Sequence, residues 1–306
     1  MQIIQETTEF VLPKRSAVAI GKFDGIHLGH QKLLEKITEQ KKNGLLATVF
    51  TFSPAPEAFF NGKEDKGLMS IEEKRAAFAE AGIDVLVEFP LNNETAATEP
   101  ERFVEEYLAK KMRVAFIAAG TDLSFGQKGA GNAELLKHMA EAFDYSVEII
   151  DKVSVEGEEV SSTLIREALA KGDMEKAEKL LGTPYRISGV VSHGRQLGRT
   201  IGMPTVNILP PKEKLLPPNG VYYSTVWLKQ KRYPSISNIG YKPTVSEEQV
   251  IGVETYLYDF SADVYGREIT VELLDFKRPE KKFDSIEELK AQTHRDIEEG
   301  HRFHKT

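Results

Sequence analysis

The sequence of 306 residues predicts an α/β domain followed by a β domain with a terminal helix. From Ala17 to about Asp151, apolar strand-like runs alternate with helical patterns over short connections. This alternation is typical of a parallel sheet covered by helices. After about Gly182 the runs become rich in β-branched and aromatic residues, and Gly, Pro and Asn turns separate them. This second pattern indicates an antiparallel barrel or sandwich.

The expected elements follow one another in a regular order. In the first half they are a strand at 17–20, a helix at 31–37, a helix at 72–82, a strand at 83–89, a helix at 100–112, a strand at 113–120, a helix at 133–143 and a strand at 145–150. In the second half we expect strands at 185–194, 205–209, 220–228, 251–260 and 267–276. A final helix at 285–303 has a possible capping box of Ser285 and Glu288. We place the domain boundary after the helical segment 174–181, which gives domains 1–182 and 183–306.

Composition excludes several classes of protein. Apolar residues make up 41% and charged residues 28% of the chain, as in a globular protein, and the net charge of −7 argues against a nucleic-acid binder. No apolar run approaches 18 residues, so we expect no membrane span. The first residues lack the features of a signal peptide, and cysteine is absent, which excludes disulfides and thiolate chemistry. These observations fit a cytoplasmic enzyme.

The most informative segment is GKFDGIHLGH at 21–30, between a strand and a helix. His27 and His30 lie three residues apart at the start of that helix. The first turn of a helix carries free N–H groups and the positive end of the dipole, which suits a phosphate. Gly21, Gly25 and Gly29 let the backbone approach a ligand closely. A single histidine here would more often be a surface or capping residue, but the combination predicts a nucleotide site.

The pattern GxFDGxHxGH resembles the signature of the adenylyltransferase half of bacterial bifunctional riboflavin kinase/FAD synthetases. The resemblance implies a Rossmann-like HxGH nucleotidyltransferase domain at the N-terminus. It also implies that His27 and His30 contact the phosphates of ATP and stabilise charge on the α-phosphoryl group. Phe23, Asp24 and the three glycines of the motif would belong to the nucleotide-binding loop.

Two further segments resemble the same family. In GTDLSFG at 120–126, Asp122 stands at the position of a nucleotide-contacting Asn or Asp, although it could equally form a turn. SSTLIR at 161–166 resembles the motif whose hydroxyls and arginine bind the triphosphate, which implies this role for Ser162, Thr163 and Arg166. Taken alone, this segment reads as a helix N-cap followed by a solvated arginine.

One position departs from the family pattern. The family usually has a PHP triplet after its second strand, whereas this chain reads PAP, with Ala55 in place of the histidine. If that imidazole binds phosphates, adenylyl transfer in this chain is slower or the ATP is held differently.

The second half contains GRQLGRTIGMPTVN at 194–207, which resembles the riboflavin kinase motif ending in PTxN. The resemblance implies that Thr205 and Asn207 bind Mg²⁺ and ATP phosphates, and Mg²⁺ does prefer such oxygen ligands. Gly194 and Gly202 would let backbone N–H groups reach a phosphate. In isolation PTVN would be an ordinary entry into a strand.

Other matches to the kinase half lie downstream. NIGYKPT at 238–244 matches a family loop, and Glu254 takes the position of the catalytic base, which accepts the proton of the riboflavin 5′-hydroxyl. The alternative for Glu254 is a solvent-facing strand residue. Tyr256 stands where the family usually has histidine. Arg278 and Phe283 match positions on the flavin side.

The resemblance covers about residues 17–305 and both halves. It implies that the chain uses ATP and Mg²⁺ to phosphorylate riboflavin to FMN, and a second ATP to adenylylate FMN to FAD. Two other interpretations stay open: a single active module, with the kinase retained and the adenylyltransferase impaired by Ala55, or a flavin-binding regulator without activity. The sequence does not indicate an oligomeric state.

Overall fold

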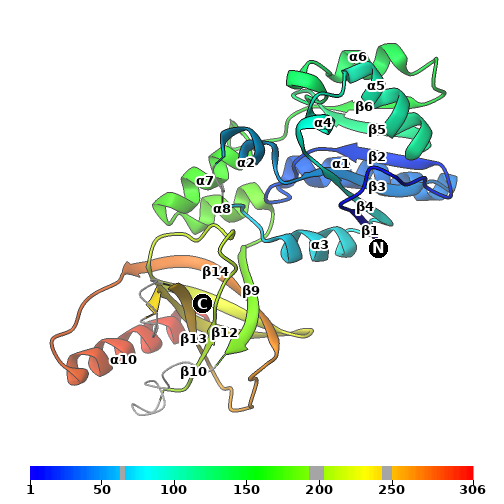
Figure 1. Ribbon diagram of the computed structural model, residues 1–306. Coiled ribbons are helices and arrows are strands. Elements are labelled where there is room, and N and C mark those ends of the chain that lie inside the picture. The colour runs from blue at the N-terminus through cyan, green and yellow to red at the C-terminus, as the bar shows by residue number, and fades with distance from the viewer. Residues whose placement is uncertain (63–65, 193–202, 243–249, 306) are drawn as a thin grey trace. The chain divides into compact units, whose positions relative to one another are not determined.

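The computed structural model describes residues 1–62, 66–192, 203–242 and 250–305. The chain forms two compact units, Met1–Ser162 and Thr163–Thr306, whose elements are labelled in Figure 1. The first is an α/β unit and the second contains a β-barrel, as the sequence predicts.

The first unit is built on a sheet of six parallel strands in the order β1-β4-β3-β2-β5-β6. The strands are β1 (Gln2–Gln5), β2 (Ser16–Ile20), β3 (Leu46–Ser53), β4 (Val85–Pro90), β5 (Val114–Gly120) and β6 (Ser146–Ile150). The edge strand β1 was not predicted, because its four residues show no clear apolar pattern. A short hairpin of β7 (Ser154–Val155) and β8 (Glu158–Glu159) follows the sheet.

The chain changes direction across this sheet between β2 and β5. From β2 it proceeds through β3 to β4 on one side, and then crosses to β5 and β6 on the other. In open parallel sheets, ligands bind at the carboxyl ends of the strands where this reversal occurs. The carboxyl ends of β2 and β5 are therefore the expected position of a ligand site.

Helices cover both faces of the sheet. They are α1 (Leu28–Glu39), η1 (Gln40–Asn43), α2 (Pro56–Asn61), α3 (Ile71–Glu80), α4 (Asn93–Ala96), α5 (Pro100–Phe103), η2 (Val104–Lys111), η3 (Gln127–Gly129) and α6 (Ala133–Met139). The predicted helix at 100–112 is one α-helical turn that continues as the π-helical segment η2.

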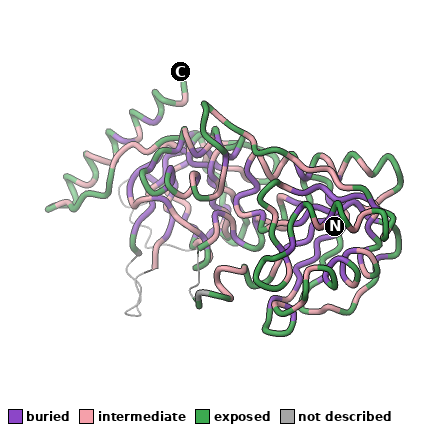
Figure 2. The backbone as a smooth tube through the Cα atoms, turned by 90° about the horizontal axis from the view of Figure 1, so that it is seen from above, coloured by how far each residue is buried: buried purple, intermediate pink, exposed green. Residues whose placement is uncertain are grey.

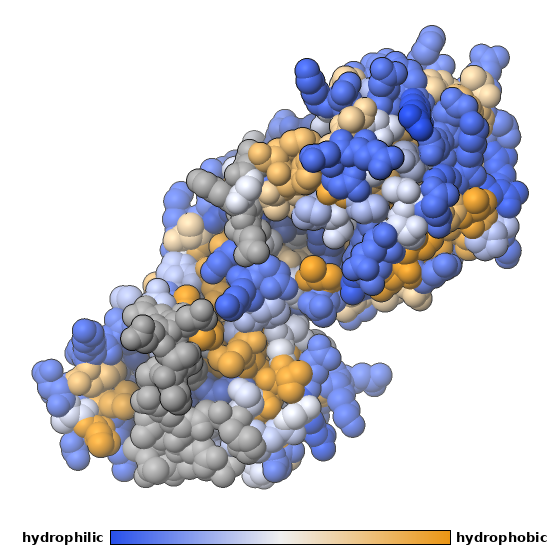
Figure 3. Space-filling model, in the orientation of Figure 1, coloured by the Kyte–Doolittle hydropathy of each residue, from blue (hydrophilic) through white to orange (hydrophobic). Residues whose placement is uncertain are grey.

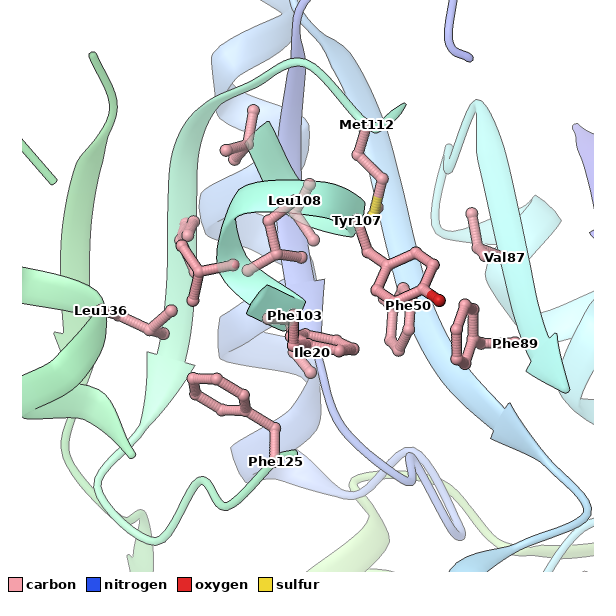
Figure 4. Packing of buried hydrophobic residues seen from close by; sticks show 14 of the residues in the cluster. Ile20, Phe50, Val87, Phe89, Phe103, Tyr107, Leu108, Met112, Phe125 and Leu136 are labelled. Atoms are coloured by element: carbon pink, nitrogen blue, oxygen red, sulfur yellow. The ribbon is translucent and has the colours of Figure 1, made fainter. Parts of the chain in front are cut away.

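The two faces carry separate apolar cores, and Figure 2 shows the buried strands between more exposed helices. On one face, Leu33 and Ile37 of α1 and Phe78 of α3 pack against β2 and β3. On the other face, Phe103 and Tyr107 pack with aromatic side chains of β3 and β4, as Figure 4 shows. Because both faces of β2 are covered, all five of its residues are buried.

The second unit contains a closed barrel of six antiparallel strands in the order β10-β13-β12-β11-β14-β9. The strands are β9 (Tyr185–Ser192), β10 (Thr205–Ile208), β11 (Gly220–Leu228), β12 (Lys231–Lys242), β13 (Val250–Leu257) and β14 (Glu268–Pro279). This decides between the barrel and the sandwich. Strand β12 was not predicted, because charged residues and Pro234 interrupt its pattern.

Among the described residues, three helices belong wholly or largely to the second unit: α7 (Ser162–Lys171), α8 (Met174–Leu181) and α10 (Ile286–Phe303). Helix α8 lies against β9 and β14. The boundary between the compact units thus falls after Ser162, the first residue of α7. The domain boundary at 182/183 stays a prediction about function.

The predicted cap of α10 forms in part. The Ser285 side chain accepts a hydrogen bond from the Glu288 N–H at 3.1 Å. The Glu288 carboxylate accepts from the Asp284 N–H at 3.4 Å rather than from Ser285, so the reciprocal bond of a capping box does not form there.

The aromatic core of the first unit yields a prediction about stability. Phe89 is 1% exposed and its ring contacts those of Phe50, Phe103 and Tyr107. Phe89→Ala should lower the free energy of unfolding of this unit by about 3 to 5 kcal/mol, because it leaves a cavity. Urea unfolding followed by circular dichroism measures the change. Phe60 is 65% exposed, and Phe60→Ala is the matched control. Equal losses in both variants would contradict the packing described.

Candidate active sites

The HxGH motif lies at the carboxyl end of β2, at the reversal point of the sheet. The segment between Ile20 and α1 bends sharply, with positive φ at Phe23 (51°), Gly25 (85°) and Ile26 (45°). Glycine adopts this conformation readily, but a β-branched isoleucine does so only under strain. Backbone strain of this kind persists where surrounding contacts enforce it.

The contacts that enforce it are hydrogen bonds to three alternate carbonyls of the loop. Side chains from outside the loop donate a hydrogen bond to each carbonyl. The donors are Thr51 at 3.4 Å and Lys74 at 3.3 Å for the Lys22 carbonyl, Ser162 at 2.9 Å for Asp24, and Gln31 at 3.0 Å for Ile26. The Asp24 carboxylate in turn accepts the Leu68 N–H at 2.7 Å. The loop is thus tied to β3, α1, α3 and the start of α7.

The two histidines are stacked at the start of α1. His27 is the N-cap, and its Nδ1 accepts the His30 N–H at 3.4 Å. The ring centroids lie 3.7 Å apart with 18° between the planes. The His30 ring also packs against the Phe23 ring, with 5.1 Å between the ring centroids. Gly29 suits this position, because a Cβ there would lie only 3.2 Å from the His27 ring.

Both imidazoles are held in the neutral form. Burial lowers the pKa of His27 to about 4, although the charges of Asp24 and Asp122 oppose the change. Burial also lowers the pKa of His30 well below its ordinary value, and the charges of His27 and Lys74 act in the same direction. The His30 Nδ1 is buried without a hydrogen-bond partner in the described part of the chain. Neutral imidazoles can donate N–H groups to a phosphate but bring no charge of their own.

The structure brings some of the other predicted residues to this loop, whereas the contacts of others stay predictions. Asp122 follows β5, and its charge acts on His27, so the loops after β2 and β5 meet. Ser162 reaches the loop itself. Thr163 and Arg166 lie on α7 within the second unit, and their contacts with a nucleotide stay predictions. Ala55 is exposed at the N-cap of α2 and forms no side-chain cap.

The second constellation lies on neighbouring strands of the barrel. The Thr205 hydroxyl donates to the Glu254 carboxylate, with 2.6 Å between Oγ1 and Oε1. Asn207 on β10 is the register partner of Glu254 on β13, and Asn238 on β12 is its partner on the other side. Side chains alternate along a strand, so Thr255 points the opposite way, into the buried hydroxyl cluster with Ser237. Glu254 is partly buried and accepts this hydrogen bond, and its role as a base stays a prediction beside the solvent-facing alternative.

The remaining kinase residues are placed less directly. Tyr256 lies two residues beyond Glu254 and packs edge-on against Tyr258, at 5.3 Å between centroids. The Arg278 guanidinium binds the buried Asp296 carboxylate of α10, with its shortest contact at 2.6 Å. Its flavin contact, like that of Phe283, stays a prediction.

Some predicted positions lie outside the described residues. These are Gly194, Gly202 and the last two residues of NIGYKPT.

Two polar side chains were missed by the sequence interpretation. Asn238 lies beside Glu254 because β12 pairs with β13. The match of NIGYKPT to the family, which begins at Asn238, is the sequence feature that could have indicated it. Lys74 reaches the HxGH loop from α3, and nothing in its local sequence indicated this. A cavity of about 180 Å³ also opens beside Thr205, with Phe260 and Tyr265 among its lining residues.

Comparison with known proteins identifies both domains. Residues 11–164 match the FAD synthetase family model, and residues 181–304 match the riboflavin kinase model. A bifunctional riboflavin kinase/FMN adenylyltransferase of Listeria monocytogenes is 34% identical over 300 residues, covering 97% of this chain and 95% of the relative. The chain belongs to this family. The Escherichia coli enzyme of the same name is 38% identical and covers 91% of this chain and 90% of its own.

A solved structure is similar along the same length. The crystal structure of a protein named as a macrolide-efflux protein from Streptococcus pneumoniae has a TM-score of 0.85 and 32% identity, with 97% of each chain covered. Within the described ranges of this chain, no helix is both long enough and apolar enough to cross a membrane. On the face shown in Figure 3, hydrophobic residues form separate patches among hydrophilic ones.

The lowered pKa of His27 predicts a pH dependence of stability. The ordinary value is 6.5 and the folded value about 4, so between these values the unfolded chain binds more protons. The contribution of neutral His27 to the free energy of unfolding is complete above pH 6.5. It is lost as the pH falls to 4, which lowers the free energy of unfolding by about 3 kcal/mol in total. His27→Asn, which keeps a capping acceptor, should flatten this dependence.

Hydrogen exchange of the β2 amides is the suitable measurement, since the single tryptophan, Trp227, lies in the barrel. The exposed His138→Asn is the control and should keep the wild-type slope. An unchanged slope in His27→Asn would contradict the proposed burial of a neutral imidazole.

Proposed function

We propose that this family member phosphorylates riboflavin to FMN in its second unit and adenylylates FMN to FAD in its first. The observation that carries the proposal is the presence of two chemically different sites, one in each unit. Stacked neutral imidazoles occupy the reversal point of the sheet, and a hydrogen-bonded carboxylate lies between two asparagines on the barrel. The named relatives carry both activities in chains of similar length.

The kinase step needs a base, because its nucleophile is a neutral hydroxyl. Glu254 would accept the proton of the riboflavin 5′-hydroxyl while the oxygen attacks the γ-phosphorus of ATP and ADP leaves. The hydrogen bond from Thr205 helps to orient this carboxylate. The cavity beside Thr205 offers a place for part of the nucleotide.

The barrel residues also fit a magnesium ion. Thr205 gives its proton to Glu254, so the lone pairs of its hydroxyl oxygen point elsewhere and are available to a cation. Asn207 on the same strand adds an amide oxygen, and Mg²⁺ prefers such hard ligands together with phosphate and water. When bound, the ion would neutralise charge on the phosphates. We therefore propose Thr205 and Asn207 as its protein ligands.

The adenylyl step needs no strong base, because the FMN phosphate is already anionic. One of its oxygens would form a bond to the α-phosphorus of ATP while the bond to pyrophosphate breaks. His27 and His30 would donate N–H groups to the phosphates, and the N-terminus of α1 adds backbone donors. We propose that Asp122 helps to hold the nucleotide, since it lies at the same edge.

Ala55 supports a narrower alternative in which only the kinase is active. Its exposed methyl group supplies no donor where the family usually has an imidazole. The retained histidine stack favours both activities over this alternative and over a flavin-binding regulator. We also propose that the protein acts in the cytoplasm, with riboflavin, FMN and ATP as its small-molecule partners.

Paired variants test the assignment. Glu254→Gln should lower the rate of riboflavin phosphorylation at least 100-fold and leave FMN adenylylation unchanged, because it removes only the base of the second unit. The double variant His27→Asn, His30→Asn should lower the rate of FMN adenylylation and leave riboflavin phosphorylation unchanged. Product chromatography with ATP and Mg²⁺ measures both rates. Glu268→Gln, an exposed substitution on β14, is the matched control. Equal loss of both activities in either variant would contradict two separate sites.

A further inference from the structure

Lys74 lies on the second turn of α3, a helix that is firmly anchored at its start. The Ser70 side chain accepts the Glu73 N–H at 3.1 Å, and the Glu73 carboxylate accepts the Ser70 N–H at 2.9 Å. This reciprocal capping box fixes the helix start, and Phe78 anchors the helix to the core. From this rigid base the Lys74 ammonium donates to the Lys22 carbonyl in the HxGH loop.

The Lys74 ammonium is partly buried and makes no ion pair among the described residues. The nearby carboxylates have other partners: the Asp24 carboxylate accepts the Leu68 N–H, and Arg75 holds Glu88 with contacts of 2.9 and 2.5 Å. Burial lowers the pKa of Lys74, against the opposing charges of Asp24 and Glu88. Even partial burial of a cation without a paired anion is unfavourable, and such groups are typical of sites that bind a charged ligand.

Lys74 and His30 share the same environment. The charge of Lys74 is one of the causes that lower the pKa of His30, and both groups adjoin the loop that holds Asp24. Burial lowers the pKa of both stacked imidazoles, so at pH 7 these rings bring no charge of their own. Lys74 is a cationic side chain that adjoins the same loop.

We propose that the Lys74 ammonium binds phosphate oxygens of the reacting nucleotides in the adenylyl-transfer site, an inference that rests on the proposed function of the first unit. The lysine forms no covalent bond and transfers no proton. It neutralises charge as the FMN phosphate oxygen bonds to the α-phosphorus and pyrophosphate departs. This role also bears on Ala55, because a cation from α3 provides phosphate binding that does not depend on the missing imidazole.

Variants of Lys74 test this role in the full-length chain. Lys74→Gln should lower kcat/KM for FMN adenylylation by 10- to 100-fold and leave riboflavin phosphorylation within twofold of wild type. Lys74→Arg, which keeps the charge, should recover a large part of the loss. Lys110→Gln removes an exposed lysine that pairs with Glu105 on η2, and it should change neither rate. Lys74→Gln should also raise the pKa of His30, followed by NMR of its ring protons, because a positive neighbour is lost.

Chemical protection of the wild-type chain gives a second test that does not depend on how a variant folds. Pyrophosphate should slow acetylation of Lys74 by acetic anhydride at least fivefold and leave Lys110 unchanged, as measured by peptide mass spectrometry. Equal acetylation of Lys74 with and without pyrophosphate, or a Lys74→Gln variant with wild-type kcat/KM, would overturn the proposal. A wild-type chain that makes no FAD would instead overturn the proposed function of the first unit.

Discussion

The hydrogen bonds to the carbonyls of Lys22, Asp24 and Ile26 are the constraint on which the first site depends. They hold a loop with three positive φ angles, one of them at an isoleucine, in a conformation that it would not adopt alone. That conformation places His27 at the N-cap of α1 and stacks it on His30. The stacking and burial then keep both rings neutral. The electrostatics of the site thus follow from the backbone of one short loop.

The two units solve different chemical problems with different groups. In the first, both reactants are anions, and the proposed site combines neutral imidazole donors and backbone N–H groups with the ammonium of Lys74. In the second, a hydroxyl must lose a proton, and Glu254, which accepts a hydrogen bond from Thr205, is the proposed acceptor. Each arrangement is rigid for its own reason: a strained loop tied to several elements in one case, and neighbouring barrel strands in the other.

The sequence was sufficient where the local structure depends on contiguous residues. The strand, loop and helix around His27 and His30 follow one another along the chain, so the spacing of the motif predicts where both histidines lie. Thr205 and Asn207 are two residues apart on one strand, so their spacing likewise predicts that they share a face. Strands β1 and β12 were missed, since their pairing rests on distant partners rather than on an apolar alternation. Lys74 was missed for the same reason, because only tertiary packing brings α3 to the loop. The pKa changes also need burial, which no sequence pattern shows.

The central claim is that one chain carries two complete and separate sites. Its most direct test is chromatography of the products formed by the purified wild-type protein with ATP and Mg²⁺, given riboflavin in one tube and FMN in another. The account predicts FMN followed by FAD from riboflavin, and FAD from FMN. FMN that accumulates without FAD would contradict the adenylyl-transfer site, and FAD from FMN with no product from riboflavin would contradict the kinase site.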